Sequence, residues 1–306
     1  MIRALALGFV LLTHAVSAEP LPDQFAALVA EHGIAPASVT VLSPAGDVLV
    51  QTAQGQDVSD AAPILSVSKT LTGACVLYLV SQGDLSLETT VADALGWDSA
   101  AGNATIAELL THTSGYRPDR TQRDILGRFL TRPERIAALL ERRRTTPLKS
   151  PAYFYNNENY IVLEAVLQAV LGQPPMDWCR TNAPGLADMA SLATARDYPA
   201  IGLAGGYAAS TPDLASFMQQ LSVTADWPLT LVDDGITYGP GIVLVDTPRG
   251  QRLIHRGGMC LLTGRGHGSV VSRDSRGWVV AFTYTGCPSR DAENDLQAML
   301  DAAISP

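Results

Sequence analysis

Apolar and polar positions follow two different periods along this chain, and the changes of period mark the elements we expect. Residues 23–32 have helical spacing. The β-rich runs 38–42 and 48–51 come next, separated by a turn that contains proline and glycine. The pattern therefore predicts a helix followed by a β-hairpin.

The middle of the chain has helical character. A continuous apolar stretch from Ser66 to Ser81, with Gly83 just past its end, predicts a buried helix. Further helices are expected at residues 106–110, 133–142, 158–171 and 212–221. Ser210 or Thr211 would cap the last of these, which has a proline in its first turn.

The C-terminal part returns to the pattern of extended chain. We expect an antiparallel meander with strands at residues 242–246, 251–255, 269–273 and 278–284, closed by a helix at 291–304. Sheet elements near both ends of the sequence would thus flank a helical middle.

The first 18 residues predict a cleaved signal peptide. A short positive start that includes Arg3 is followed by an apolar run at residues 4–15 and by small residues at 16–18. The apolar run is shorter than the roughly 20 residues of a membrane-spanning helix, and no later stretch replaces it. We expect cleavage after Ala18, a periplasmic or secreted protein, and no stable membrane anchor.

Composition indicates a globular protein of one domain or two closely joined lobes. The chain is 47% hydrophobic and 17% charged, so the residues after the signal peptide can bury a sizeable core. The formal net charge of −9 makes nucleic acid an unsuitable partner. We expect a small molecule or a peptide as the substrate, and the sequence leaves the oligomeric state open.

The cysteines and histidines bear on disulfides and metals. An oxidising compartment would allow disulfides among Cys75, Cys179, Cys260 and Cys287, with three possible pairings. We favour Cys260 with Cys287, because both lie just beyond strands of one predicted sheet, and Cys75 is a candidate reduced thiol within an apolar helix. The histidines are scattered without metal-binding spacing, so neither a metal site nor a cofactor is predicted.

The most informative chemistry lies at Ser66 and Lys69. Almost all of the basic residues of the chain are arginines, and Lys149 is the only lysine besides Lys69. Lysine, unlike arginine, can lose its proton when it is desolvated and can then act as a base. Residues three apart on a helix share one face, so Lys69 could activate the Ser66 hydroxyl as a nucleophile. The neighbouring residues are apolar, which argues against a solvated surface lysine.

Two later triplets could complete such a site. Tyr155-Asn156-Asn157 precedes an apolar helix and offers a phenol for proton transfer and an amide for a substrate carbonyl. His255-Arg256-Gly257 ends a predicted strand, and a glycine there would let a substrate approach the backbone. The free N–H groups of Ser66 and Gly258 could then form an oxyanion hole. Taken singly, each triplet is also consistent with ordinary capping and packing.

Together these motifs resemble the class C β-lactamase-related serine hydrolases, a family of β-lactamases, penicillin-binding proteins, D,D-peptidases, aminopeptidases and esterases. The resemblance rests on residues 65–70, 109–115, 155–157 and 205–214. It implies an α/β fold of the β-lactamase/transpeptidase type, an antiparallel sheet flanked by helices with an inserted helical lobe. We expect one catalytic domain at 19–306, its α/β part at about 19–80 and 205–306 and its helical lobe at about 81–204.

The resemblance also implies residue roles. Ser66 would be the acylated nucleophile, Lys69 its activating partner, and Tyr155 a base or proton shuttle, with the group that takes the first proton left open. Asn157, His255 and Gly257 would bind the substrate. His112, in the loop of residues 109–115, would be structural.

Departures from the family pattern narrow the expected substrate. The third triplet reads His-Arg-Gly where class C β-lactamases usually have Lys-Thr-Gly, which favours a hydrolase of small esters or D-amino-acid peptides. A β-lactamase and a non-catalytic binding protein remain as alternatives. Strand alternation favours Arg256 facing away from the site, and Lys149 is expected to be a solvated loop residue.

Overall fold

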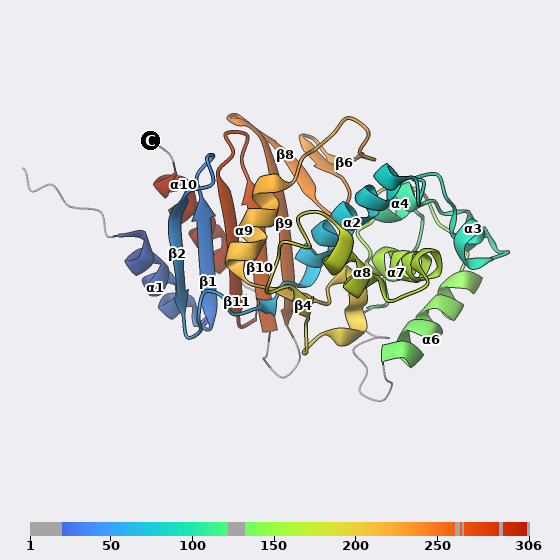
Figure 1. The fold of residues 1–306 in the computed structure, drawn as a ribbon, viewed down its shortest axis with the longest axis horizontal. Helices are drawn as coiled ribbons and strands as arrows, with labels where there is room; N and C mark the ends of the chain where they lie inside the picture. Colours follow the sequence, from blue (N-terminus) through green and yellow to red (C-terminus); the bar gives the residue numbers. More distant parts are fainter. Residues whose placement is uncertain (1–19, 122–131, 261–263, 265, 288–289, 305–306) are drawn as a thin grey trace, which may run out of the picture.

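The computed structural model describes residues 20–121, 132–260, 264, 266–287 and 290–304. The predicted signal peptide, residues 1–18, lies outside the described residues. The centre of the molecule is an eight-stranded antiparallel sheet with the order β2-β1-β11-β10-β9-β8-β7-β6 (Figure 1). Its strands are β1 (Ala37–Leu42), β2 (Val48–Gln54), β6 (Thr230–Asp233), β7 (Ile236–Tyr238), β8 (Val243–Thr247), β9 (Gly250–Cys260), β10 (Gly266–Arg273) and β11 (Val279–Thr285).

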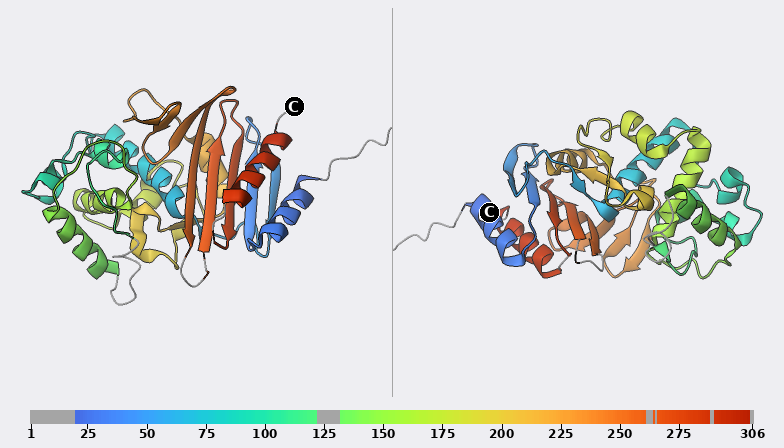
Figure 2. Two further views of the ribbon diagram at one scale, coloured as in Figure 1. Left: turned by 180° about the vertical axis from the view of Figure 1, so that it is seen from behind. Right: turned by 90° about the horizontal axis from the view of Figure 1, so that it is seen from below.

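Helices cover both faces of this sheet. Helices α1 (Leu21–His32) and α10 (Arg290–Ala303) lie side by side on one face, and α9 (Thr211–Gln220) lies on the other (Figure 2). Strand β1 shows why the sheet is covered twice. Val39 and Val41 pack into the core under α1 and α10, whereas the hydroxyls of Ser38 and Thr40 hydrogen-bond Thr211 at 2.7 and 3.0 Å.

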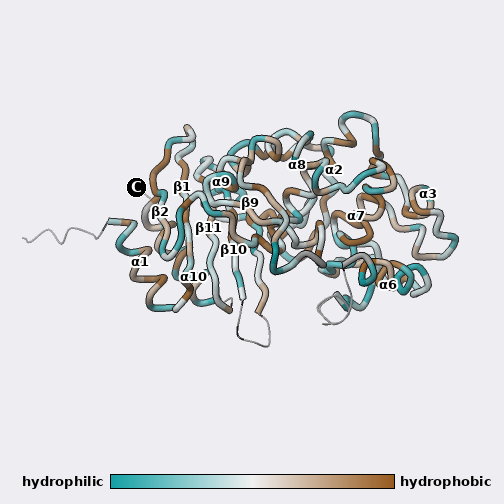
Figure 3. Tube along the Cα trace, turned by 60° about the horizontal axis from the view of Figure 1, so that its bottom comes forward, coloured by the Kyte–Doolittle hydropathy of each residue, from teal (hydrophilic) through white to brown (hydrophobic). Residues whose placement is uncertain are grey.

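The other α-helices described form a lobe beside the sheet, on the side away from β2 (Figure 1). Their bounds are α2 (Ser68–Gln82), α3 (Val91–Leu95), α4 (Ile106–Leu110), α6 (Arg132–Thr145), α7 (Asn157–Leu171) and α8 (Pro175–Asn182). Helix α7 is hydrophobic along most of its length and packs inside, whereas the outer helix α6 is mostly hydrophilic (Figure 3). A small second sheet has the order β3 (Ala62–Pro63), β5 (Tyr207–Ala209) and β4 (Ala193–Thr194). This architecture confirms the α/β fold expected from the sequence.

A short turn positions the segment that contains Ser66 and Lys69. The helix expected to begin at Ser66 starts as the 3-10 turn η1 (Leu65–Val67) and continues as α2. Leu65 has a φ of 47°, a strained value for a side chain of its size. Glycines allow the loop before β8 to lie directly on α2, because a Cβ on Gly241 would overlap the backbone of Lys69. None of the described helices has the length and apolar character needed to span a bilayer.

Two disulfides join distant parts of the chain. Cys260 at the end of β9 is bonded to Cys287 after β11, the pair that the sequence favoured. The suggestion that Cys75 stays reduced was wrong, because it is bonded to Cys179 and ties α2 to α8. Both cysteines of this second pair are buried, and burial in an apolar helix is equally compatible with a thiol and a disulfide.

Candidate active site

Ser66 and Lys69 lie together at the start of α2. The 3-10 turn brings side chains at i and i+3 over one another, and the Nζ atom of Lys69 is 3.2 Å from the Oγ atom of Ser66. Lys69 is completely buried, whereas Ser66 is partly exposed. The hydroxyl therefore remains accessible while its amine neighbour is shielded from water.

Lys69 is held by two further oxygen acceptors. Its Nζ atom is 2.7 Å from Oδ1 of Asn157 and 2.6 Å from the backbone oxygen of Ala204. A neutral amine has two N–H groups and one lone pair, so donation to these two acceptors directs the lone pair at the Ser66 hydroxyl. In that state Ser66 donates its hydrogen bond to Lys69, which is the arrangement that proton removal requires.

Burial allows Lys69 to lose its proton near neutral pH. Desolvation lowers the pKa of Lys69 to about 7, and the negative charge of Asp119 acts in the opposite direction. The rings of Tyr155 and Tyr160 lie 5.0 and 5.6 Å from the Lys69 Nζ atom, where they can stabilise its charged form. Lys69 can therefore exchange a proton in the range where an enzyme base is most effective.

Tyr155 stands beside the same pair as a neutral phenol. Burial raises its pKa, and the Ser66 side chain only partly offsets that effect. Its raised pKa makes the phenolate costly to form. Lys69, with a pKa near neutrality, is thus the better base, and Tyr155 is suited to donating and relaying a proton.

His255 lies on β9 as a buried, neutral residue. Its Nδ1 atom is 2.5 Å from the backbone oxygen of Gly241, which also accepts a hydrogen bond from Thr70 at 2.5 Å. A carbonyl oxygen can only accept, so Nδ1 carries the proton and Nε2 is left as an acceptor. Burial, followed by the charge of Lys69, lowers the pKa of His255 to about 3. His255 therefore presents a hydrogen-bond acceptor and no positive charge.

Gly257 permits close packing of β9 against the turn η1, which contains Ser66. A Cβ at this position would lie 2.9 Å from the backbone nitrogen of Ser66 and 2.5 Å from Oγ of Ser269. Any larger residue would push β9 away from η1. Strand β8 begins at Val243, opposite Ile254, so β9 continues past the end of that neighbour. Gly258 is exposed on this continuing part of the strand.

Arg256, Lys149 and His112, which the sequence analysis placed outside the catalytic group, have other surroundings. Arg256 turns toward α10 and forms an ion pair with Glu293 at 3.2 Å. Lys149 is exposed in a loop. His112 is buried, and its Nδ1 atom accepts from the Asn159 side chain at 2.9 Å while Nε2 lies 3.2 Å from the Tyr238 hydroxyl. The hydrogen bonds of His112 are thus satisfied inside the protein, as expected of a structural residue.

Sequence reasoning missed three contributors to the site. The Ala204 and Gly241 backbone oxygens hold Lys69 and His255, and Asp119 contacts Asn157. Backbone acceptors have no residue-type signature, and a lone aspartate in a loop is a common surface feature. These contacts become visible only when the loops are folded onto α2.

A pocket of about 220 Å³ opens beside these groups. It is lined by Tyr153, Tyr155, Tyr238, Val243, Ile254, His255 and Arg256. Aromatic and aliphatic side chains form most of its wall. The pocket can therefore hold a small apolar group beside Tyr155 and His255.

A family model described as Beta-lactamase matches residues 23–304. The chain belongs to this Beta-lactamase family. No curated protein sequence matches it. The class C β-lactamase of Rhodobacter sphaeroides has a similar structure, with a TM-score of 0.75 and 16% identity over 94% of this chain and 100% of that one.

Two further solved structures are similar. The β-lactamase/D-alanine carboxypeptidase of Pseudomonas syringae has a TM-score of 0.74 and 13% identity over 94% of this chain and 98% of that one. The D-amino acid amidase of Ochrobactrum anthropi SV3 has a TM-score of 0.71 and 17% identity, covering 92% and 98%. At these identities the likeness shows the fold, which is typical of serine hydrolases in the Beta-lactamase family.

Proposed function

We propose that this protein is a serine hydrolase that cleaves small esters or amides without a carboxylate next to the scissile bond, D-amino-acid derivatives among them, through an acyl-enzyme on Ser66. The observation that carries the proposal is the buried amine of Lys69. Its Nζ atom lies 3.2 Å from the Ser66 hydroxyl and has two acceptors for its two neutral N–H groups. No such arrangement is needed for packing alone.

The chemistry follows from the positions of these groups. The Ser66 oxygen attacks the substrate carbonyl while its proton passes to Lys69, and the carbonyl oxygen becomes negative. Backbone N–H groups of Ser66 and Gly258 stabilise that oxygen. The proton then moves, with Tyr155 as the relay, to the leaving alcohol or amine. A water molecule, deprotonated by the same amine, attacks the ester carbon and releases Ser66.

Charge favours substrates without a carboxylate next to the scissile bond. His255 is neutral, and the charge of Arg256 is directed to Glu293. Along this described part of β9, neither side chain offers a free cation to a carboxylate. The Nε2 atom of His255 instead favours a substrate that donates a hydrogen bond. β-Lactams and peptides ending in a carboxylate are therefore expected to be poorer substrates than esters or amides that lack one.

The decisive experiment is intact-protein mass spectrometry of the acylated enzyme. The wild-type protein is incubated with a fluorophosphonate, which phosphonylates a reactive serine with loss of fluoride. Parallel samples contain a p-nitrophenyl ester, a D-amino acid amide, a peptide ending in D-Ala-D-Ala, or a penicillin. We expect one label per chain from the fluorophosphonate and turnover of the p-nitrophenyl ester or the D-amino acid amide.

Two serine variants interpret the result. Ser66→Ala should abolish labelling and turnover, whereas Ser81→Ala, at an exposed serine of the same helix, should leave both unchanged. Rapid turnover of penicillin would favour a β-lactamase. Absence of labelling in the wild-type protein would refute the hydrolase and support a binding protein that keeps the fold.

We also propose that the protein is exported and acts in the periplasm or the medium. The predicted signal peptide and the two disulfides support this location. Mass spectrometry of the protein recovered from cell fractions tests it. A cytoplasmic protein that retains residues 1–18 would contradict the proposal.

A further inference from the structure

Asp119 contacts the Asn157 residue that holds the Lys69 amine. One oxygen of Asp119, Oδ2, accepts from the Asn157 backbone nitrogen at 2.9 Å and from the Asn157 Nδ2 atom at 3.0 Å. The other oxygen accepts from the backbone nitrogen of Thr121 at 2.8 Å. Both oxygens of this carboxylate are thereby fixed.

These contacts determine which way the Asn157 amide points. Its NH2 group faces a carboxylate, which can only accept, so its oxygen must face Lys69. A rotation of the amide by half a turn would put two oxygens together and two donors together. Asp119 therefore keeps the acceptor of Asn157 at 2.7 Å from Lys69.

Asp119 also acts on Lys69 through its charge, since it favours the protonated amine. Among the described residues, the tyrosines and histidines that surround the amine are neutral near pH 7. Burial raises the pKa of Tyr155 and Tyr160 and lowers that of His112 and His255. Asp119 is therefore the charged group whose removal should move the Lys69 equilibrium.

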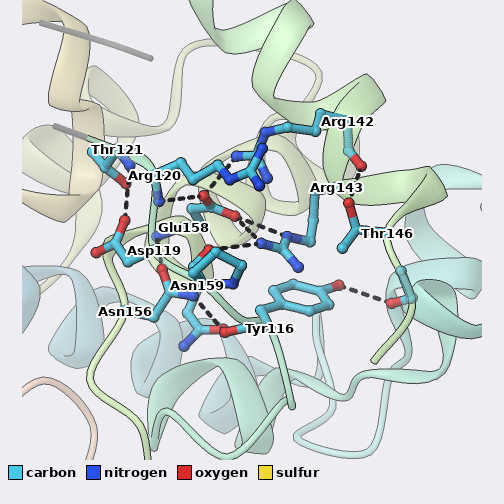
Figure 4. A network of polar contacts seen from close by, with 12 residues as sticks. Tyr116, Asp119, Arg120, Thr121, Arg142, Arg143, Thr146, Asn156, Glu158 and Asn159 are labelled. Atoms are coloured by element: carbon cyan, nitrogen blue, oxygen red, sulfur yellow. Dashed lines mark hydrogen bonds and ion pairs between the residues drawn. The ribbon is translucent and has the colours of Figure 1, made fainter. Parts of the chain in front are cut away.

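The backbone on either side of Asp119 is hydrogen-bonded to a buried ion-pair network (Figure 4). Glu158, next to Asn157, accepts from the Arg120 backbone nitrogen at 2.8 Å and from Arg142 at 2.6 Å. Arg143 binds the same carboxylate and also donates to the Pro118 oxygen at 3.2 Å. The residues on both sides of Asp119 are thus fastened to the first turn of α7 and to α6.

We propose that Asp119 is a positioning residue of the active site, which orients the Asn157 amide toward Lys69 and holds a negative charge beside it. The proposal rests on the function assigned above, because Lys69 is its target. Asp119 affects the reaction only through Asn157 and Lys69. The proposal can therefore be tested by measuring the protonation of Lys69 itself, without any substrate.

The presence of only two lysines makes this measurement simple. Protein labelled with carbon-13 at the lysine ε position gives two signals, and Lys149→Arg leaves that of Lys69. A pH titration of this signal in the full chain gives its midpoint. Asp119→Asn keeps the size and the acceptor oxygen but removes the charge, so the midpoint should fall by about one pH unit.

Matched variants separate charge from folding. Asp119→Glu retains the charge and should keep the midpoint close to that of wild type even if its geometry is impaired. Asp177→Asn removes an exposed carboxylate elsewhere and should leave the midpoint unchanged. An Asp119→Asn protein that is folded but titrates like wild type would overturn the proposal.

A double-mutant cycle tests the route through Asn157. Asp119→Ala should lower kcat by about tenfold in the wild-type background and by a clearly smaller factor in Asn157→Ala, where only the effect of its charge on Lys69 remains. Equal losses in the two backgrounds would show that Asp119 does not act through Asn157. If the wild-type protein hydrolyses nothing but the lysine midpoint still moves, the proposed function fails and the effect of Asp119 on Lys69 stands.

Discussion

Replacement of Lys69 should change how the stability of the protein depends on pH. The amine is completely buried, and its pKa falls from 10.5 in an exposed lysine to about 7. Between these two values the unfolded chain binds a proton that the folded chain does not. The free energy of unfolding therefore rises with pH across this interval, because the unfolded state holds more protons.

The size of the effect follows from the two pKa values. Between pH 7 and pH 9 the linkage relation gives a gain of roughly 2 kcal/mol from this one group. Below pH 6 both states are protonated and the contribution of Lys69 no longer changes with pH. In Lys69→Met the gain should be absent, whereas the cost of leaving the Ala204 and Asn157 oxygens without their donor is nearly independent of pH.

Urea unfolding followed by tryptophan fluorescence measures this difference, since the chain has four tryptophans. The wild-type protein and Lys69→Met are compared at pH 5.5, 7, 8 and 9 with the disulfides intact. The difference between their unfolding free energies should stay constant up to about pH 6 and then move by roughly 2 kcal/mol in favour of wild type.

Two stability profiles that run parallel from pH 7 to 9 would refute this reasoning. They would mean that Lys69 stays protonated in the folded protein and cannot be the base near neutral pH. Lys149→Arg provides the control, because that exposed lysine should leave the profile unchanged.

Three further changes have expected effects on stability, each measured by urea unfolding. Glu158→Gln removes the charge shared by two arginines and should cost about 3 to 5 kcal/mol, and a cost below 1 would contradict the buried network. Gly241→Ala should cost about 3 kcal/mol through overlap with α2, against about 1 for Gly172→Ala, which has a similar φ but open space. Joint replacement of Cys75 and Cys179 by alanine should cost about 3 to 5 kcal/mol, because their bond closes a long loop, and an unchanged midpoint would exclude that role.

The sequence predicted the architecture well where one physical rule dominated. Strands β1, β2 and β8 to β11 and the longer helices follow clear apolar patterns, and they lie where these patterns predicted them. The short helices α3 and α8 and strands β3 to β7 were not predicted. Most of β6 is exposed, so no buried face imposes a pattern on it.

The site was predictable as far as its chemistry was local. Ser66 and Lys69 share one turn, and a buried lysine requires partners whatever the fold. The partners themselves were not predictable, because Asp119, Ala204 and Gly241 meet α2 only through folding of loops distant in sequence. The Cys75–Cys179 bond was missed for the same reason, since the pairing depends on how α8 packs against α2.

The pairing of β1 with β11 has a consequence for the order in which the molecule is assembled. Residues Ala37 to Leu42 of β1 pair with Val279 to Tyr284 of β11. Strand β1, near the start of the chain, can therefore complete its pairing only after β11, near the end of the chain, has been made. The same late hairpin, β10 with β11, supports β9 behind the turn η1. During synthesis the segment that contains Ser66 therefore emerges long before its surroundings can form. Such non-local contacts favour slow folding, and Ser66 gains the strand that packs behind it only after β9, β10 and β11 have been made.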